Sequence, residues 1–278
     1  MAEGEDVLEL PGLTLRGVTR GGIQTCVMVP ELDVMFDVGG TTRGQLRFGT
    51  ILVTHGHQDH LGGLPYLISQ RHLAGLGSPD VHMPAEVLDP FTRIMDAWRE
   101  IEGFDLHAKL FGHAPDDAFE LGKNLRAACV RSVHRVPSLS WIVERTSERL
   151  MPVHAGKTGP EIAELKRAGV PITETHTVDV LCVTGDTQIE TFDREPRLRR
   201  AKVLVHEVTA WDDRRSVEEI RFWGHTHVDE IIPRVEQFEG DALVLVHRSP
   251  RHTRAEAEAV VATRFPASMR SKVHVFGR

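Results

Sequence analysis

The chain of 278 residues contains few cysteines, and their small number excludes a disulfide framework. There are three, an odd number, and Cys26, Cys129 and Cys182 each lie in an apolar, strand-like stretch. No two of them have the spacing of a zinc-binding pair. We therefore expect three small buried side chains that play no part in metal binding.

Long apolar runs and an excess of positive charge are also absent. No apolar stretch approaches the roughly 20 residues that a membrane-spanning helix needs, so no membrane contact is expected. The acidic segment 1–6 lacks the basic and apolar regions of a signal peptide, which makes the cytoplasm the expected location. The net charge of −7 gives no overall attraction to nucleic acid.

Basic residues are nevertheless concentrated in two stretches. Residues 194–202 include four Arg and one Lys, and a solvated face is the favoured interpretation of this stretch. The second stretch contains Arg248, Arg251 and Arg254. It directly follows a candidate metal ligand, so it could face a substrate that carries phosphate.

Histidine, in contrast, is plentiful, with 16 residues, three of which belong to one hexapeptide: His55-Gly56-His57-Gln58-Asp59-His60. The apolar and β-branched run at 51–54 predicts a short buried strand directly before it. Imidazole nitrogens and carboxylate oxygens without thiolates favour zinc, with manganese or iron as alternative occupants. A merely polar loop is the weaker interpretation, because four potential ligands follow one strand end within six residues.

Four further apolar runs end on side chains that can bind metal. These side chains are His134, Asp186, the pair His206 and Glu207, and His247. A single His after a strand is usually an ordinary hydrogen-bonded residue. Five strand ends of this kind indicate sheets whose ends share one edge, where a rigid scaffold holds a site.

The spacing of these residues divides them into two neighbouring metal sites. The first consists of His55, His57 and His134, the second of Asp59, His60 and His247, and Asp186 is suited to bridging both. Two ions roughly 3.5–4 Å apart hold the attacking and the leaving oxygen of a displacement, and they lower the pKa of a bridging water towards about 7. Asp59 fits either a pure ligand role or an added role in orienting the nucleophilic water.

A second pair of residues is a candidate for proton transfer. Glu207 and His225, the latter within 224–227, could form a carboxylate–imidazole relay that protonates the leaving oxygen. A buried hydrogen-bonded pair without a catalytic role is the alternative.

The order of elements suits two packed β-sheets with helices on their outer faces, in a single domain that spans residues 1–278. Strands are expected at 7–54, 105–150 and in the runs that end at Asp186, His206 and His247; helices are expected at 61–76, 85–99, 159–169, 214–222, 227–238 and 253–263. The inner face of helix 85–99 is predicted to consist of Val87, Ile94, Met95 and Trp98.

The segment from His55 to Pro65 resembles the signature of the metallo-β-lactamase superfamily. Within that superfamily the chain is similar to ribonuclease Z, the endonuclease that removes the 3′ trailer of precursor tRNA, and especially to its short plant form. The similarity rests on Gly185-Asp186-Thr187, on 206–209, on 224–227 and on 243–251. It implies an α+β fold, a four-layer αββα sandwich, with a dinuclear zinc site at one edge.

The resemblance also implies roles for residues outside the metal sites. Glu207 and His225 take the places of the family's acid-transfer pair, and Arg251 that of a phosphate contact. The family pairs as a homodimer, for which helix 61–76 is a candidate surface.

The chain departs from the family pattern at several positions. Arg248 and His252 stand where Phe and Tyr are usual, and Trp141 stands where Tyr is usual. No Gly/Pro-rich insertion long enough for the tRNA-binding arm of bacterial members occurs at 140–185, so no such arm is expected.

Three functions are compatible with these observations. The first is a dinuclear zinc phosphodiesterase that cleaves precursor tRNA endonucleolytically through a metal-activated hydroxide. The second is a hydrolase of the same fold that acts on a small phosphodiester or a lactone, which the net charge of −7 favours. The third is a zinc-dependent binding or scaffold protein without catalysis, although a purely structural site needs only four closed ligands.

Overall fold

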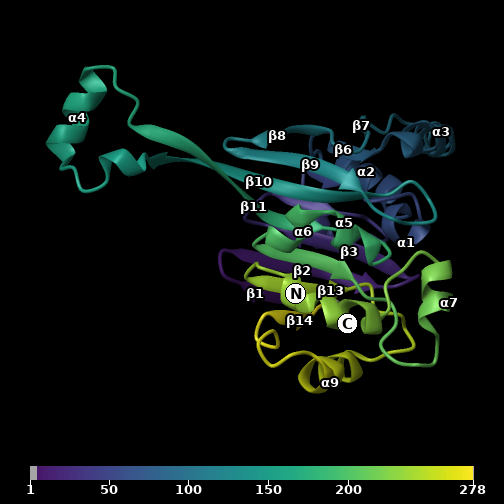
Figure 1. The fold of residues 1–278 in the computed structure, drawn as a ribbon. Helices are drawn as coiled ribbons and strands as arrows, with labels where there is room; N and C mark the ends of the chain where they lie inside the picture. Colours follow the sequence, from purple (N-terminus) through teal and green to yellow (C-terminus); the bar gives the residue numbers. More distant parts are fainter. Residues whose placement is uncertain (1–4, 278) are drawn as a thin grey trace.

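The structure is a computed structural model that describes residues 5–277, and its centre is a pair of β-sheets packed face to face (Figure 1). Within these residues the first sheet has seven strands in sequence order: β1 Asp6–Leu10, β2 Leu13–Arg20, β3 Gln24–Val29, β4 Val34–Phe36, β5 Thr50–Leu52, β6 Asp80–Pro84 and β7 Lys109–His113. The second has seven in the order β14 Val273–Val275, β13 Ala242–Val246, β12 Val203–Glu207, β11 Thr173–Val183, β10 Leu139–Leu150, β9 Leu125–Arg131 and β8 Ala118–Gly122.

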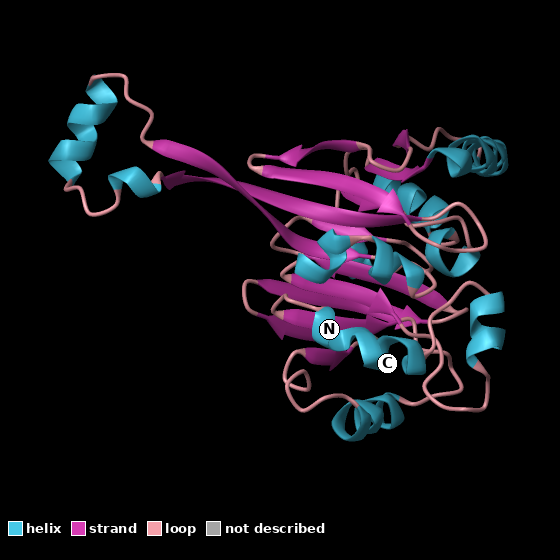
Figure 2. Ribbon diagram, viewed as in Figure 1, coloured by secondary structure: helices cyan, strands magenta, loops and turns pink. Residues whose placement is uncertain are grey.

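Helices cover the outer face of each sheet, which produces four layers (Figure 2). The first sheet is covered by α1 Gln58–Leu61, α2 Leu64–Leu73 and α3 Ala85–Glu102. The second is covered by α5 Glu190–Arg194, α6 Pro196–Arg200, α8 Val228–Ile231 and α9 Arg254–Arg264. The remaining helices are α4 Gly159–Arg167, α7 Val217–Phe222 and the 3₁₀ turns η1 Arg43–Arg47, η2 Pro152–His154 and η3 Ile232–Gln237. The αββα sandwich expected from the sequence is confirmed.

Apolar side chains form one cluster between the two sheets and one beneath each helix layer. The strand β13 has the sequence Ala-Leu-Val-Leu-Val and is buried along its whole length, as expected of a parallel strand covered on both faces. Strand β2 instead alternates between buried and partly exposed residues, because only one of its faces meets the core. Trp141 is fully buried between the sheets.

The parallel strands of each sheet direct their carboxyl ends to one edge. Strands β4 to β7 are parallel neighbours in the first sheet, and β11 to β14 are parallel neighbours in the second. Residues that directly follow these strands therefore gather at the same edge.

Most expected helices are present, with some shifted boundaries. The predicted helix 61–76 is divided into α1 and α2, and the predicted helix 227–238 into α8 and η3. Helix α3 continues to Glu102, three residues beyond the expected end at 99. Its predicted inner face is partly wrong, because Ile94 and Trp98 are 46% and 42% exposed while Met95 and Phe91 are buried.

The expectation that residues 140–185 contain no arm is wrong. Strands β10 and β11 pair from Trp141 opposite Val183 to Leu150 opposite Thr173, and their outer halves leave the sheet as a two-stranded ribbon (Figure 1). The ribbon leads to η2 and to α4, which has no buried residue and stands away from the sandwich.

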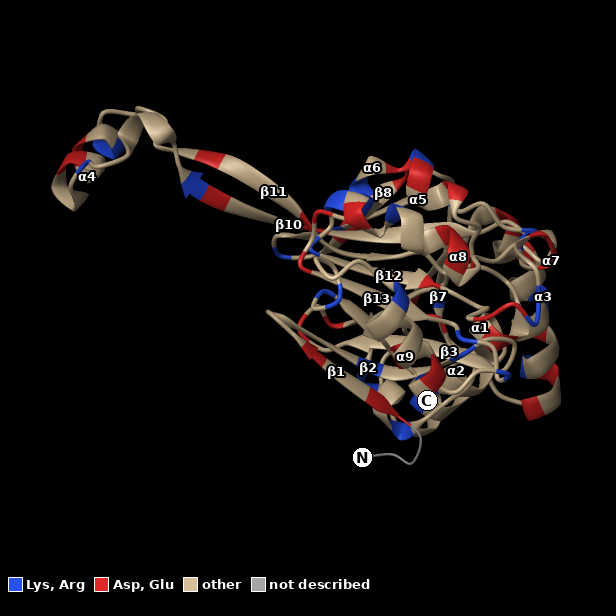
Figure 3. Cartoon of the chain, turned by 60° about the horizontal axis from the view of Figure 1, so that its bottom comes forward, with Lys and Arg blue, Asp and Glu red and all other residues tan. Residues whose placement is uncertain are grey.

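The arm escaped sequence analysis because a two-stranded ribbon satisfies its hydrogen bonds across the pair and needs no apolar run. In the arm part of β11, Thr173, Thr175 and Thr177 occupy every second position, and the same strand continues into its buried end. The sequence therefore shows no boundary between the arm and the sheet. Arg and Glu side chains alternate along β10 of the ribbon, whereas β11 carries Glu174 and Asp179 and no Lys or Arg (Figure 3).

The basic stretch at 194–202 is not uniformly a solvated face. Arg194, Arg200 and Lys202 are exposed, but Arg197 forms ion pairs of 2.5 Å with Asp179 and with Glu144 at the base of the arm. Arg197 therefore links α6 to both strands at the base of the arm.

The three cysteines are buried and unpaired, as expected. No helix in the described part of the chain has both the length and the apolar character needed to cross a bilayer. The acidic segment 1–6, from which no signal peptide was expected, lies mostly outside the described residues.

Candidate functional site

Side chains that follow four strands meet at one edge of the sandwich. They are His55 and His57 after β5, Asp59 and His60 in α1, His134 after β9, Asp186 after β11 and His247 after β13. All seven residues that the sequence analysis assigned to metal binding belong to one cluster. Two residues at this edge have a left-handed backbone conformation that is unusual for residues other than Gly. They are His247, with φ +61°, and Asp37 directly after β4, with φ +58°.

The first group consists of His55, His57, His134 and Asp186. His55 Nε2 lies 3.0 Å from His57 Nδ1, and His134 Nε2 lies 3.4 Å from that same nitrogen. Asp186 Oδ2 lies 3.5 Å from His55 Nε2. Each of the four offers one atom within 4.8 Å of the others, close enough for all of them to contact one ion.

The second group consists of Asp59, His60 and His247. Asp59 Oδ2 lies 3.4 Å from His247 Nε2 and 3.6 Å from His60 Nε2. The second oxygen of Asp186, Oδ1, lies 3.2 Å from both His60 Nε2 and His247 Nε2. Asp186 therefore directs one oxygen towards each group, the position expected of a bridging carboxylate.

The residues present fit a pair of divalent ions. His60 Nε2 and Asp186 Oδ1 are buried and have no hydrogen-bond partner among residues 5–277, although buried polar atoms of this kind normally have one. Two ligand atoms about 2.1 Å from one tetrahedral ion are about 3.4 Å apart, which is close to the spacing of the imidazole nitrogens here. In a neutral imidazole whose proton is on the rear nitrogen, the nitrogen that faces the cluster carries a lone pair. Such lone pairs would repel one another at these distances without a cation between them.

Hydrogen bonds from the rear of the cluster orient four of its five imidazoles. His60 Nδ1 donates to Asp37 Oδ2 at 2.7 Å, and His134 Nδ1 donates to the Gly224 carbonyl at 2.8 Å. His55 Nδ1 lies 3.0 Å from Thr54 Oγ1, and His247 Nδ1 lies 3.0 Å from Thr209 Oγ1; both hydroxyls direct their own proton to a carboxylate. Nε2 of these four residues thus faces the cluster, an arrangement that metal-binding histidines usually show.

Sequence analysis missed Asp37, Thr209 and Gly224. Asp37 follows the apolar strand β4, which is the same signal that identified the other strand-end residues. Gly224, at φ +85°, allows the chain to pass close to His134, because an added Cβ would lie 2.6 Å from His134 Nδ1. No sequence pattern marks Thr209 as a partner of His247.

Burial keeps several imidazoles in the neutral form that metal binding requires. The pKa of His55 lies well below its ordinary value, chiefly because the ring is buried and because other histidines surround it. Burial likewise lowers the pKa of His57 and of His134. Burial opposes ionisation of Asp186, but the neighbouring His247, His60 and His55 hold the pKa of this carboxyl well below its ordinary value.

Glu207 and His225 lie beside the cluster. His225 Nδ1 donates to Glu207 Oε1 at 2.9 Å, and the Glu207 side chain is completely buried. Burial alone would lower the pKa of His225, but the charge and hydrogen bond of Glu207, together with Asp186, raise it to about 9. His206 is turned away from the cluster, with Nδ1 donating to the Glu207 carbonyl at 2.7 Å.

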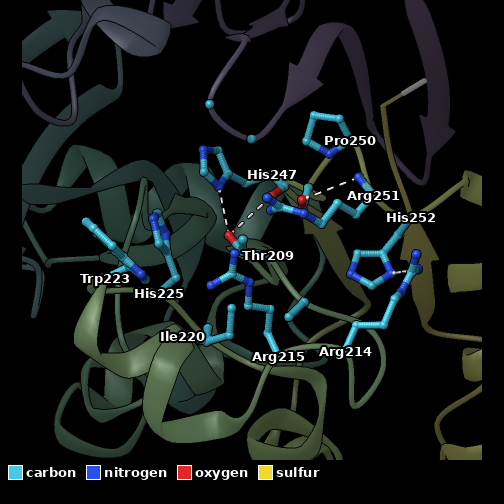
Figure 4. Close-up of a pocket in the computed structure, with 14 residues that line it drawn as sticks. Thr209, Arg214, Arg215, Ile220, Trp223, His225, His247, Pro250, Arg251 and His252 are labelled. Carbon is cyan, nitrogen blue, oxygen red and sulfur yellow. Dashed lines mark hydrogen bonds between the residues drawn. The ribbon is translucent and has the colours of Figure 1, made fainter.

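Arg251 lines a cavity next to His225 and His247 (Figure 4). The two neighbouring arginines of its sequence cluster do not face the cavity. Arg248 is buried, with its guanidinium donating to the Gly277 and His252 carbonyls, and Arg254 pairs with acidic residues. Of this cluster, only Arg251 is positioned to meet a substrate.

Comparison with known proteins identifies the family. The description "Beta-lactamase superfamily domain" matches residues 41–248, about three quarters of the chain. The chain therefore belongs to the β-lactamase superfamily, whose fold implies a divalent metal at the cluster described above.

Sequence relatives define the family more narrowly. A tRNase Z of Arabidopsis thaliana is 31% identical over 262 residues, which cover 94% of this chain and 94% of the relative. A chloroplastic tRNase Z of the same plant is 31% identical over 91% of this chain and 73% of its own length. Within the superfamily, the chain is thus a member of the tRNase Z family, also called ribonuclease Z, as its motifs predicted.

Solved structures agree on the fold. The short form of human tRNase Z matches with a TM-score of 0.61 over 94% of both chains at 18% identity. The metallo-β-lactamase fold protein YhfI of Bacillus subtilis matches with a TM-score of 0.63 over 94% of both chains at 13% identity. At these identities the matches show a shared architecture.

Proposed function

We propose that this chain is a dinuclear zinc phosphodiesterase that removes the 3′ trailer of precursor tRNA endonucleolytically. The observation that carries the proposal is the position of Asp186, with one oxygen towards each ligand group, next to the Glu207–His225 pair. Membership of the tRNase Z family supports precursor tRNA as the substrate.

The proposed ligands of the first ion are His55, His57, His134 and Asp186, and those of the second are Asp59, His60, His247 and Asp186. Two divalent ions held there would lower the pKa of water and neutralise charge on the phosphate. Zinc is the proposed metal because all ligand atoms are imidazole nitrogens or carboxylate oxygens, a set that manganese and iron also accept.

The chain's own residues perform the remaining steps. Asp59, whose Oδ2 also accepts the Gly22 backbone N–H at 2.8 Å, is fixed to orient the attacking water. Glu207 holds the Nδ1 proton of His225, which leaves Nε2–H to donate to the leaving 3′-oxygen. The tRNA part of the product then ends in a 3′-hydroxyl. Arg251 is the proposed contact for a phosphate oxygen.

The arm supports a large substrate. Its ribbon and α4 extend beyond the sandwich with little burial of their own, which leaves the surface of α4 available to a partner. We propose that the arm contacts the body of the tRNA while the acceptor end occupies the metal cluster.

Oligomeric state and domain organisation form a second part of the proposal. Large apolar side chains of α2 and α3 are exposed, namely Tyr66, Leu73, Ile94, Trp98 and Ile101. Exposed large apolar side chains on neighbouring helices are typical of an interaction site, and we propose a homodimer that buries them. The chain is proposed to fold as one domain, because the cluster between the sheets joins both halves of the sequence. Cytoplasmic location stays a prediction.

Incubation of the zinc-loaded protein with a precursor tRNA transcript tests the function. The expected products are a tRNA with a 3′-hydroxyl after the discriminator base and a trailer with a 5′-phosphate, and chelation abolishes their formation. A fully metallated protein that cleaves no such transcript contradicts the proposal.

The net charge of −7 favours the alternative, a hydrolase of a small phosphodiester or a lactone. Turnover of bis(p-nitrophenyl) phosphate or a lactone without any cleavage of tRNA identifies this alternative. Full metal occupancy without turnover of any of these substrates identifies a binding or scaffold protein.

A further inference from the structure

A cavity of about 380 Å³ opens beside the metal cluster and has His225 and His247 in its wall (Figure 4). Its size falls within the range of roughly 300–1,000 Å³ that is typical of small-molecule sites. The wall contains three arginines, Arg214, Arg215 and Arg251, and no carboxylate. Arg214 pairs with Asp212 at 2.5 Å and Arg215 with Glu219 at 3.4 Å, whereas Arg251 forms no ion pair among the described residues. Arg251 is therefore the cation of this wall that is available to an anionic ligand.

The same wall contains an indole. Trp223 lines the cavity and is 51% exposed, which is unusual for so large an apolar side chain. The Arg135 guanidinium lies over the Trp223 ring, 4.9 Å from its centroid, and holds the indole in place.

Trp223 is fixed relative to the reacting groups. The next residue, Gly224, accepts the Nδ1 proton of His134 through its carbonyl, and His225 follows directly. The indole therefore stands one residue from a contact with a proposed metal ligand and two residues from the proposed proton donor.

An aromatic plane and the Arg251 guanidinium beside a phosphodiesterase centre match the two parts of a nucleotide, its base and its phosphate. We propose that this cavity, the Trp223 cavity, binds one unpaired nucleotide of the RNA, with its base stacked on Trp223. The inference rests on the proposed function and extends it to a specific base-binding site.

The position of the proton donor, His225, decides which of the two nucleotides that flank the scissile bond enters the cavity. His225 protonates the leaving 3′-oxygen, so the nucleotide that carries this oxygen lies on the His225 side. The Trp223 cavity shares His225 with the active site and thus receives the last nucleotide retained in the tRNA. The first nucleotide of the trailer leaves from the opposite side.

A double-mutant cycle tests this assignment. The zinc-loaded wild type and the Trp223→Ala variant are compared on transcripts with a normal or an abasic residue at the last retained position. Loss of the base or of the indole alone is expected to lower kcat/KM about tenfold, mainly through KM, and loss of both to lower it by little more. Trp223→Phe, which keeps an aromatic face, restores most of the loss.

A control variant and a small ligand complete the experiment. Phe111→Ala removes an aromatic residue that is 40% exposed and does not line the cavity, and this variant is expected to retain the wild-type response to base removal. By calorimetry, the wild type is expected to bind adenosine 3′-monophosphate about tenfold more tightly than inorganic phosphate, and Trp223→Ala to lose this preference.

The outcomes separate the inference from the proposed function. Three results would each overturn the inference. The first is that base removal and Trp223→Ala lower kcat/KM independently, and the second is that Trp223→Ala is coupled to the first trailer nucleotide instead. The third is that Trp223→Ala keeps the preference for adenosine 3′-monophosphate over inorganic phosphate. A wild type that cleaves no precursor tRNA but shows a Trp223-dependent preference for the nucleotide overturns the proposed substrate and retains the base-binding cavity.

Discussion

Glu207 Oε1 accepts a hydrogen bond from His225 Nδ1 at 2.9 Å and, at the same time, the backbone N–H of Thr226 at 3.2 Å. The Thr187 N–H donates to this oxygen as well, at 3.1 Å. The carboxylate is therefore fixed on several sides, and it determines which ring nitrogen of His225 carries its proton towards the cluster.

Removal of this carboxylate should slow proton transfer to the leaving group. We expect Glu207→Gln to lower kcat on precursor tRNA roughly 10²–10⁴-fold, the usual contribution of acid catalysis. The loss on bis(p-nitrophenyl) phosphate should be much smaller, because p-nitrophenolate leaves without protonation. Steady-state kinetics on both substrates measure the difference, and the exposed His107→Asn variant is the control. Equal losses on both substrates contradict the acid-transfer role.

The hydrogen bond between Asp37 and His60 should contribute to metal affinity. Asp37→Asn removes the negative charge behind His60 Nδ1, and we expect zinc to bind about 10–100-fold more weakly. Asp186→Ala, which removes the shared carboxylate, should lower the zinc content from two ions per chain to one or none. Competition with a chromophoric chelator and elemental analysis measure both effects. An unchanged affinity in Asp37→Asn argues against this contribution.

Deletion of the arm should separate RNA binding from chemistry. Residues 147–176 can be replaced by a two-residue turn, because Thr146 and Thr177 pair directly. We expect the shortened protein to keep its activity on bis(p-nitrophenyl) phosphate, while KM for precursor tRNA rises at least about tenfold. If KM for the tRNA is unchanged, the arm does not contact the substrate.

Trp141 should stabilise the strand that leads into the cluster. Its Nε1 donates to the Val53 carbonyl at 2.9 Å, and the indole is fully buried between the sheets. Trp141→Phe leaves that carbonyl without a partner and creates a small void, so the free energy of unfolding should fall by roughly 2–4 kcal/mol. Urea denaturation measures the change. The half-exposed Trp223→Phe serves as the control and should change stability by less than about 0.5 kcal/mol.

Stability should fall in mild acid partly because of His82. Burial and the neighbouring His113 lower the pKa of His82 to about 4, so the folded protein keeps this ring neutral. The unfolded chain takes up a proton near its ordinary pKa of about 6.5. The stabilisation is thus complete above about pH 6.5 and is lost as the pH falls towards 4, by about 1–3 kcal/mol.

His82→Phe tests this contribution, because a phenyl ring keeps the stacking on Phe119, whose centroid lies 3.9 Å away, but cannot bind a proton. Melting temperatures at pH 7.5 and pH 5 should differ less in this variant than in the wild type. His113, whose Nε2 lies 2.9 Å from His82 Nδ1, loses this partner, whereas acid-sensitive groups away from the pair are common to both proteins and cancel in the comparison. An identical difference in both contradicts the role of His82.

The sequence by itself determined which side chains follow buried strands. Apolar β-branched runs can be recognised locally, and a His or Asp placed directly after such a run must lie at the end of a strand. This local rule predicted the αββα layers and the seven residues of the cluster. Applied to β4, it also identifies Asp37, whose position after Phe36 follows the same pattern.

Only the tertiary structure decided how distant segments meet. The arm, the exposure of Ile94 and Trp98 and the contact of Gly224 with His134 depend on what packs against each segment. A helix presents its apolar side chains in the same periodic pattern whether they face its own sheet or solvent, and a ribbon pairs with itself without an apolar core. The packing partner, which no local pattern encodes, therefore fixed the shape of the surface around the cluster.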